Sequence, residues 1–146
     1  MIMAFVRKSA LVPYSAERMF DLVYDVESYP DFLPWCHRTA VISESADRIC
    51  GRIEVARLGI HQTFSTCNRF ERHTRMDIAL LDGPFRKLHG GWRFTPLRVD
   101  ACKVELELDF EFSGGLIDKA FGAVFNQIAN SLVDAFCKRA DEVFRG

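Results

Sequence analysis

Four histidines and five cysteines are among the side chains of this sequence that could take part in catalysis or metal binding. Catalysis requires a nucleophile or base beside an orienting partner, and zinc requires closely spaced ligands. Cys36 and His37 are adjacent and could pair a nucleophile with a base, but packing of Cys36 beneath Trp35 explains this cysteine without any chemistry. The other histidines stand alone, as structural and surface histidines do: His61, His73 and His89. We therefore predict no catalytic residue, no metal site and no enzymatic activity.

The cysteines also indicate a redox compartment. Their number is odd, and the closest two, Cys36 and Cys50, are 14 positions apart, which fits neither a disulfide framework nor a zinc site. We expect reduced thiols, as in a cytosol-like compartment, at Cys36, Cys50, Cys67, Cys102 and Cys137.

Carboxylates gather in one further place, the segment 101–112. Glu105, Glu107, Asp109 and Glu111 alternate with apolar residues, so they share one face of a strand. Solvation of an outer sheet face is a sufficient explanation for such a row. The opposite, apolar face is expected to face the core.

Length and composition indicate one ordinary domain, residues 1–146, because 146 residues with 49% hydrophobic content can bury a core without disulfides or metal. The formal charge of −1 gives no general attraction to nucleic acid or anionic lipid. No apolar run reaches the roughly 20 residues that span a bilayer. The first ten residues carry Arg7 and Lys8 and no apolar signal core. We predict a cytoplasmic protein whose membrane contact, if any, is peripheral.

The spacing of apolar residues predicts the strands and helices that position these side chains. A first strand over 3–12 precedes a helix that Ser15 caps and that ends near Asp25, and a short helical turn or stiff loop follows over 28–35. Leu116–Phe144 has apolar residues at spacings of three and four and is predicted to form one long helix. Period-two patterns predict six more strands, at 37–45, 49–58, 60–71, 74–81, 85–96 and 101–112.

Short turns between the strands predict consecutive antiparallel hairpins. Gly90 and Gly91 interrupt one strand and predict a bulge or a sharp bend. Only a concave sheet face is long enough to cover the apolar stripe of the last helix. The expected fold class is α+β: a curved antiparallel sheet of seven strands wrapped around a long C-terminal helix, with two short helices after the first strand. The space between sheet and helix could hold a ligand, although the thirteen Phe, two Trp and three Tyr could equally fill it as a plain core.

Four segments resemble the coenzyme Q-binding START-like family, also called the polyketide cyclase/dehydrase type. They cover almost the whole chain in the expected order: DVESYPDFLPWC (25–36), GIHQTFSTCNRF (59–70), GPFRKLHGGWRF (83–94) and FEFSGGLIDKAFGAVF (110–125). The resemblance implies a helix-grip fold, in agreement with the elements above.

This family resemblance implies two roles. One is that of a ubiquinone-binding chaperone for respiratory electron transfer, with ubiquinone as bound ligand, no required cofactor, and peripheral contact with the inner membrane. Burial of an isoprenoid tail contributes about 0.8 kcal/mol per methylene, so apolar walls are effective. A register slip of one residue would turn the strand members of the wall outward. By position in the matching motifs, the wall is Phe32, Leu33, Trp35, Phe64, Phe85, Leu88, Trp92, Phe94, Phe121, Phe125 and Ile128.

The other role is that of a bacterial ribosome-association toxin, which binds the large ribosomal subunit and blocks subunit joining. Such a protein needs clustered positive charge for RNA phosphates. A mixed, solvated surface explains the basic residues equally well, and no DNA partner is expected. We rank quinone or lipid binding first, and both roles could coexist. The candidates for a basic face are Arg69, Arg72, Arg75, Arg86, Lys87, Arg93 and Arg98.

Overall fold

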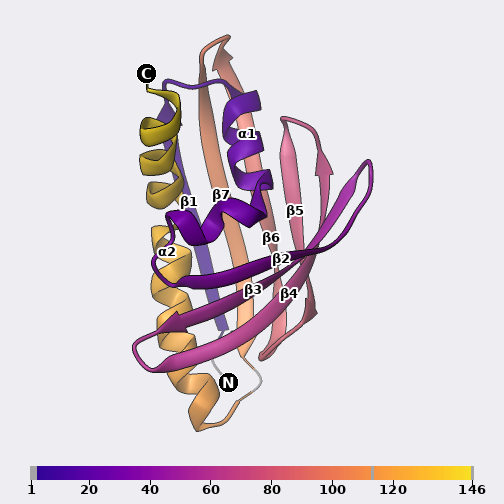
Figure 1. Cartoon of the computed structure of the whole chain (residues 1–146), viewed down its shortest axis with the longest axis vertical. Helices are drawn as coiled ribbons and strands as arrows, with labels where there is room; N and C mark the ends of the chain where they lie inside the picture. The colour runs from indigo at the N-terminus through magenta and orange to yellow at the C-terminus, as the bar shows by residue number, and fades with distance from the viewer. Residues whose placement is uncertain (1–2, 113, 146) are drawn as a thin grey trace.

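The computed structural model describes residues 3–112 and 114–145. Met1, Ile2, Ser113 and Gly146, which belong to the expected domain of residues 1–146, lie outside the described residues. The elements follow the expected order (Figure 1): β1 (Met3–Val12), α1 (Ala16–Tyr24), the 3-10 helix η1 (Val26–Asp31), β2 (Cys36–Glu44), β3 (Arg48–Arg57), β4 (Ile60–Glu71), β5 (Arg75–Asp82), β6 (Phe85–Arg98), β7 (Ala101–Phe112) and α2 (Leu116–Phe144).

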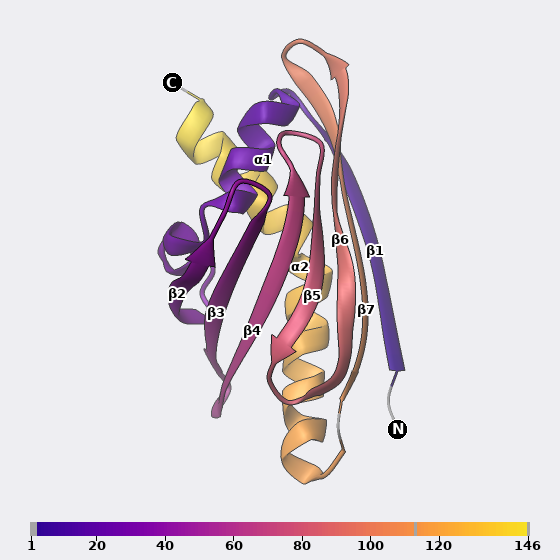
Figure 2. The same cartoon turned by 90° about the vertical axis from the view of Figure 1, so that its right-hand side faces the viewer.

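The seven strands form one antiparallel sheet in the order β1-β7-β6-β5-β4-β3-β2. Strands β2 to β7 pair with their neighbours in sequence, and β1 closes the other edge by pairing with β7. The sheet curls strongly, as its side view shows (Figure 2). The predicted α+β class and the hairpin series are therefore confirmed.

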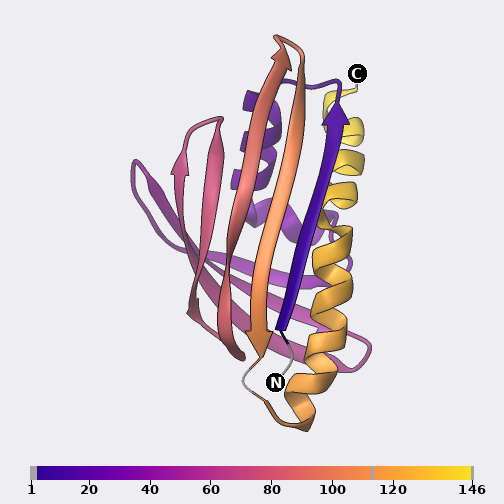
Figure 3. The ribbon, with the colours of Figure 1, turned by 180° about the vertical axis from the view of Figure 1, so that it is seen from behind.

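Helix α2 lies on the concave side of the sheet. β1 runs beside it, while β2, β3 and β4 cross it steeply (Figure 1). Seen from behind, the outer face of β6, β7 and β1 is turned to the viewer, with α2 at the β1 edge (Figure 3). The enclosed core includes Phe20, Phe110 and Phe136, whose side chains are buried. Among the described helices, none combines the length and the apolar character needed to cross a membrane.

Strand β7 has the two faces that its sequence predicts. Val104, Leu106 and Phe110 are fully buried against the core. The carboxylates on the other face pair with cations of neighbouring strands: Arg7 lies 2.9 Å from Glu107, and Lys87 lies 3.1 Å from Asp109. Such partly solvated pairs contribute only about 0–1 kcal/mol each, so this face is an ordinary outer surface.

Gly90 and Gly91 do not form the predicted bulge. Gly90 pairs with Ile78 on one side and Leu108 on the other without a register shift, and the irregularities of β6 lie elsewhere, at 85–87 and 96–98. The glycines are required because the neighbouring backbones come very close. A Cβ atom on Gly90 would lie 2.0 Å from the Glu107 carbonyl oxygen, and one on Gly91 would lie 2.7 Å from that of Met76.

The prediction of five reduced thiols is also wrong. Cys50 and Cys67 form a disulfide between β3 and β4, where they stand directly opposite each other with Cα atoms 4.0 Å apart. The two residues are 17 positions apart, and the antiparallel register brings them together, which their spacing alone does not reveal. Cys36, Cys102 and Cys137 are free.

We therefore expect the denatured, unreduced protein to titrate three thiols with Ellman's reagent, and the reduced protein to titrate five. Reduction should lower the free energy of unfolding by about 2–4 kcal/mol, because the cross-link restricts the unfolded chain. Urea unfolding with and without dithiothreitol measures this change. Five titratable thiols without reductant would contradict the disulfide.

Candidate ligand-binding site

An apolar cavity of about 90 Å³ lies between the sheet and α2. Its walls come from η1, from β3 to β7, from α2, and from Trp35 in the loop before β2. Six of the eleven residues that the sequence predicts for the ligand wall line this cavity: Trp35, Phe64, Leu88, Trp92, Phe125 and Ile128.

A second, larger hollow opens to solvent beside the cavity. This groove, of about 950 Å³, runs between the Pro-rich segment 31–35 and the C-terminal half of α2. Phe32 and Leu33, which the sequence also predicts for the wall, line the groove and not the cavity. The groove is also lined by positively and negatively charged residues, including Arg57, Asp134 and Lys138. Trp35 and Ile128 line both hollows, so these two side chains lie at the boundary between them.

Three predicted wall residues line neither hollow. Phe85 packs on Phe125 with ring centroids 4.9 Å apart, and Phe121 packs on Phe112 at 5.7 Å. Phe94 packs edge-on against Phe20 of α1 at 5.7 Å. All three point inward as the strand and helix patterns require, but here α1 or α2 packs directly on the sheet. The structure therefore places Phe85, Phe94 and Phe121 in solid core.

The sequence prediction does not include twelve of the eighteen residues that line the cavity, and two of these twelve lie on α2. Leu132 and Phe136 line the cavity and continue the helical stripe from Ile128 at spacings of four. The Phe136 ring packs edge-on against Trp92 at 5.2 Å and against Tyr29 at 5.4 Å. The i, i+4 continuation was the signal that could have identified them.

Two polar side chains interrupt the apolar wall. Thr66 and Asn68 line the cavity because they follow Phe64 at spacings of two on the inner face of β4. The Asn68 amide Nδ2 donates to Met76 Sδ at 3.7 Å. Its carbonyl oxygen Oδ1 is buried and has no hydrogen-bond partner among the described residues. A buried acceptor left unpaired costs about 1–3 kcal/mol. Among the described residues, Ser65 Oγ and Glu111 Oε1 are also buried without a hydrogen bond, but neither residue lines the cavity.

The adjacent Cys36 and His37 do not form a nucleophile with its base. Cys36 is buried, and burial raises the pKa of its thiol to about 11, so the thiol is protonated at neutral pH. His37 is exposed on the other face of β2, where its ring lies 6.2 Å from that of His61. The side chains therefore point to opposite sides of the sheet.

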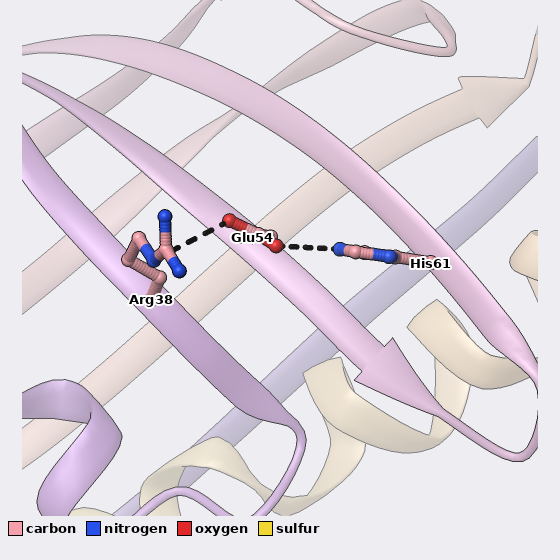
Figure 4. A network of polar contacts seen from close by, with 3 residues as sticks. All are labelled: Arg38, Glu54 and His61. Carbon is pink, nitrogen blue, oxygen red and sulfur yellow. Dashed lines mark hydrogen bonds and ion pairs between the residues drawn. The ribbon is translucent and has the colours of Figure 1, made fainter.

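A small polar network occupies the outer face of β2, β3 and β4 (Figure 4). A hydrogen bond of 2.5 Å joins His61 Nε2 to Glu54 Oε1, and Arg38 Nε lies 3.9 Å from Glu54 Oε2. The hydrogen bond from His61, and then the charge of Arg38, lower the pKa of the Glu54 carboxyl. The network faces away from the cavity and stabilises the sheet surface.

Folding should therefore favour the ionised form of Glu54. A carboxyl with a lowered pKa adds stability above its unfolded pKa, about 4.5, and this stability is lost as the pH falls through the folded pKa. We expect the difference in free energy of unfolding between wild type and Glu54→Gln to be largest above about pH 4.5 and to shrink in more acid solution. Urea unfolding across this range measures it, with Glu71→Gln as the control at an exposed carboxylate. A difference that grows on acidification would contradict the assignment.

The seven candidate basic residues do not form an uninterrupted basic face. Arg75 lies 3.8 Å from Asp77, and Arg98 lies 3.8 Å from Asp100. Arg72 stacks over the rings of Tyr24 and Phe70. Together with the Lys87–Asp109 and Arg86–Glu111 pairs, these contacts produce a surface of mixed charge.

Comparisons with known proteins agree with the fold. Residues 12–137 match the family model "Polyketide cyclase / dehydrase and lipid transport". The ribosome association toxin RatA of Escherichia coli K12 is 46% identical over 143 residues, which cover 98% of this chain and 90% of that protein. The mitochondrial coenzyme Q-binding protein COQ10 homolog B of Xenopus laevis is 28% identical over 141 residues, which cover 94% of this chain and 58% of that protein.

Solved structures show the same architecture. The Zhui aromatase/cyclase from Streptomyces sp. R1128 superposes with a TM-score of 0.82 at 18% identity, covering 96% of this chain and 94% of that one. A START superfamily protein from Mycobacterium smegmatis gives 0.79 at 21% identity, covering 95% and 98%. The chain therefore shares the helix-grip architecture of these structures and belongs to the polyketide cyclase/dehydrase and lipid transport family, with RatA as a relative.

Proposed function

We propose that this protein binds ubiquinone or a closely related polyprenyl lipid and carries it in support of respiratory electron transport. The observation that carries the proposal is the apolar cavity between sheet and helix, which lies beside an open groove and shares Trp35 and Ile128 with its lining. The lipid transport description of the family and the coenzyme Q-binding relative support the same class of ligand. In this role the protein works in the cytoplasm and touches the inner membrane only peripherally.

The size of the cavity defines how such a ligand would be held. About 90 Å³ is well below the roughly 300–1,000 Å³ of pockets for drug-sized molecules, so the cavity accepts a ring only when its wall moves. Displacement of the Trp35 and Ile128 side chains would join it to the groove. We propose that the ring occupies the cavity and that the isoprenoid tail extends along the groove, where each buried methylene adds about 0.8 kcal/mol.

Titration with ubiquinone-1 tests this proposal. Trp35 and Trp92 are the only two tryptophans of the chain, and both line the cavity, so their fluorescence reports its occupancy. We expect saturable quenching of the tryptophan fluorescence, and this quenching should persist in Trp35→Phe because Trp92 remains. Mass spectrometry of an organic extract of the purified protein should detect a co-purified quinone. A clean extract together with unchanged fluorescence would refute quinone binding.

A second candidate function is association with the ribosome. It is favoured by the 46% identity to RatA, which extends over nearly the whole of both chains and exceeds the identity to the coenzyme Q-binding relative. Against it stands the mixed charge of the surface where a basic face was expected. Sucrose-gradient analysis of ribosomal subunits with added protein distinguishes the two. Blocked subunit joining by a protein that carries no quinone would reverse our ranking.

A further inference from the structure

We infer that Asn68 makes the cavity selective for a ring with a hydrogen-bond-donating hydroxyl group, such as a phenol or a hydroquinone, over the same ring with a carbonyl or methoxy oxygen. The inference rests on the proposed binding of an apolar ligand in the cavity. It adds the polar chemistry by which the site recognises one end of that ligand.

Asn68 carries an unsatisfied hydrogen-bond acceptor. Asn68 Oδ1 is buried and has no hydrogen-bond partner among the described residues, although its residue lines the cavity. Buried polar atoms in folded proteins nearly always have a partner, so an unpaired oxygen in a residue that lines the cavity points to a group that a ligand supplies once the wall has moved to admit it. A hydroxyl hydrogen is such a group.

Met76 fixes the orientation of the Asn68 amide. Asn68 Nδ2 donates to Met76 Sδ, and a thioether sulfur can only accept hydrogen bonds. Turning the amide by half a rotation would set Oδ1 against Sδ, which places two acceptors face to face. The amide therefore presents its oxygen, and not its nitrogen, as the free group.

Asn68 lies in apolar surroundings. On the neighbouring strands it stands between Ile49 and Ile78, both of which line the cavity, and Trp92 lies on the same wall. In such apolar surroundings a hydrogen bond is stronger than in water, and an unmatched acceptor is more costly. A ligand carbonyl at this position would place a second acceptor against Oδ1, whereas a ligand hydroxyl would donate a hydrogen bond to Oδ1. The reduced ring of a quinone ligand should therefore bind more tightly than the oxidised ring.

Three matched probes test the inference: 4-butylphenol, butylbenzene and 4-butylanisole. All three share the ring and the butyl chain. The phenol offers a hydrogen-bond donor, butylbenzene has no polar group, and the anisole offers only an acceptor. Isothermal titration calorimetry gives the affinities, and the two indole N–H signals of Trp35 and Trp92 in a ¹H–¹⁵N spectrum report that the cavity is occupied. For the wild type we expect the phenol to bind about tenfold more tightly than butylbenzene, and the anisole to bind no better than butylbenzene.

Two variants assign this preference to Asn68 and its orientation. Asn68→Leu has a similar shape and should remove the preference for the phenol while butylbenzene binding is kept. Met76→Leu removes the sulfur and frees the amide to turn, so the anisole should gain relative to butylbenzene. Asn130→Leu, an asparagine exposed on α2, is the control and should behave like the wild type.

These measurements distinguish a failure of the Asn68 role from a failure of ligand binding in the cavity. Equal binding of phenol and butylbenzene by the wild type, with shifted indole signals, would overturn the role of Asn68 and leave ligand binding intact. A phenol preference that survives in Asn68→Leu would also overturn it. If no probe moves the indole signals, ligand binding in the cavity fails, and the selectivity fails with it. Should Asn68→Leu not fold, the wild-type and Met76→Leu measurements decide the question.

Discussion

Gly51→Leu should abolish the binding of ubiquinone-1, weakening it by about a hundredfold or more, without unfolding the protein. Gly51 lies on β3 in the wall of the cavity. A Cβ atom there would meet Val26 Cγ1 at 3.5 Å and the Ala40 carbonyl oxygen at 3.6 Å, which are ordinary contacts. The rest of a leucine side chain would project into the hollow and take the space of the ring.

The matched control is Gly51→Ala, because its single methyl group fits and leaves most of the cavity open. It should bind ubiquinone-1 within a few-fold of the wild type. The free energy of unfolding of Gly51→Leu should change by less than about 1.5 kcal/mol, because filling a void offsets the strain of added atoms. Tryptophan fluorescence and urea unfolding measure the two quantities. Unchanged binding in Gly51→Leu would show that the ring lies elsewhere.

Gly90→Ala should lower the free energy of unfolding by about 3 kcal/mol or more. The added Cβ would stand 2.0 Å from the Glu107 carbonyl oxygen of β7, and that backbone cannot move without disturbing the central strands. Gly90 also has a φ of +153°, which a residue with a side chain rarely adopts. Urea unfolding followed by circular dichroism measures the loss.

Gly59→Ala is the control for this variant. Gly59 has a φ of +79°, but a Cβ atom added there would have no neighbour within 4 Å, so only conformational strain remains. We expect a loss of about 1–2 kcal/mol there. Equal losses at the two glycines would contradict the argument that close backbone approach dictates Gly90.

Much of the fold was predictable because periodicity reports burial directly. The alternation of Leu106 and Leu108 with Glu105 and Glu107 defined the two faces of β7, since only one side of the sheet meets the core. The spacing of three and four along Leu116–Phe144 likewise predicted the helix that the sheet must cover. The resemblance to the START-like family agreed with both.

The rest depended on which residues meet across the structure. The Cys50–Cys67 disulfide requires the β3–β4 register, and the need for Gly90 comes from a backbone atom of another strand. Phe85 and Phe125 both point inward, yet only Phe125 lines the cavity. A sequence pattern predicts that a side chain points inward, but it does not predict where a space remains between the helix and the sheet. The unpaired oxygen of Asn68 likewise depends on three strands, because Asn68 on β4 lies between Ile49 on β3 and Ile78 on β5.

An isotope-filtered NOESY spectrum of the labelled protein with ubiquinone-1 tests the central claim most directly, because it locates the ligand by contact. We expect cross-peaks from the ring methyl and methoxy groups of ubiquinone-1 to Trp92, Leu132 and Phe136, deep between the sheet and α2. Cross-peaks confined to exposed side chains, with none to these three residues, would contradict the claim that the interior of this protein is its ligand-binding site.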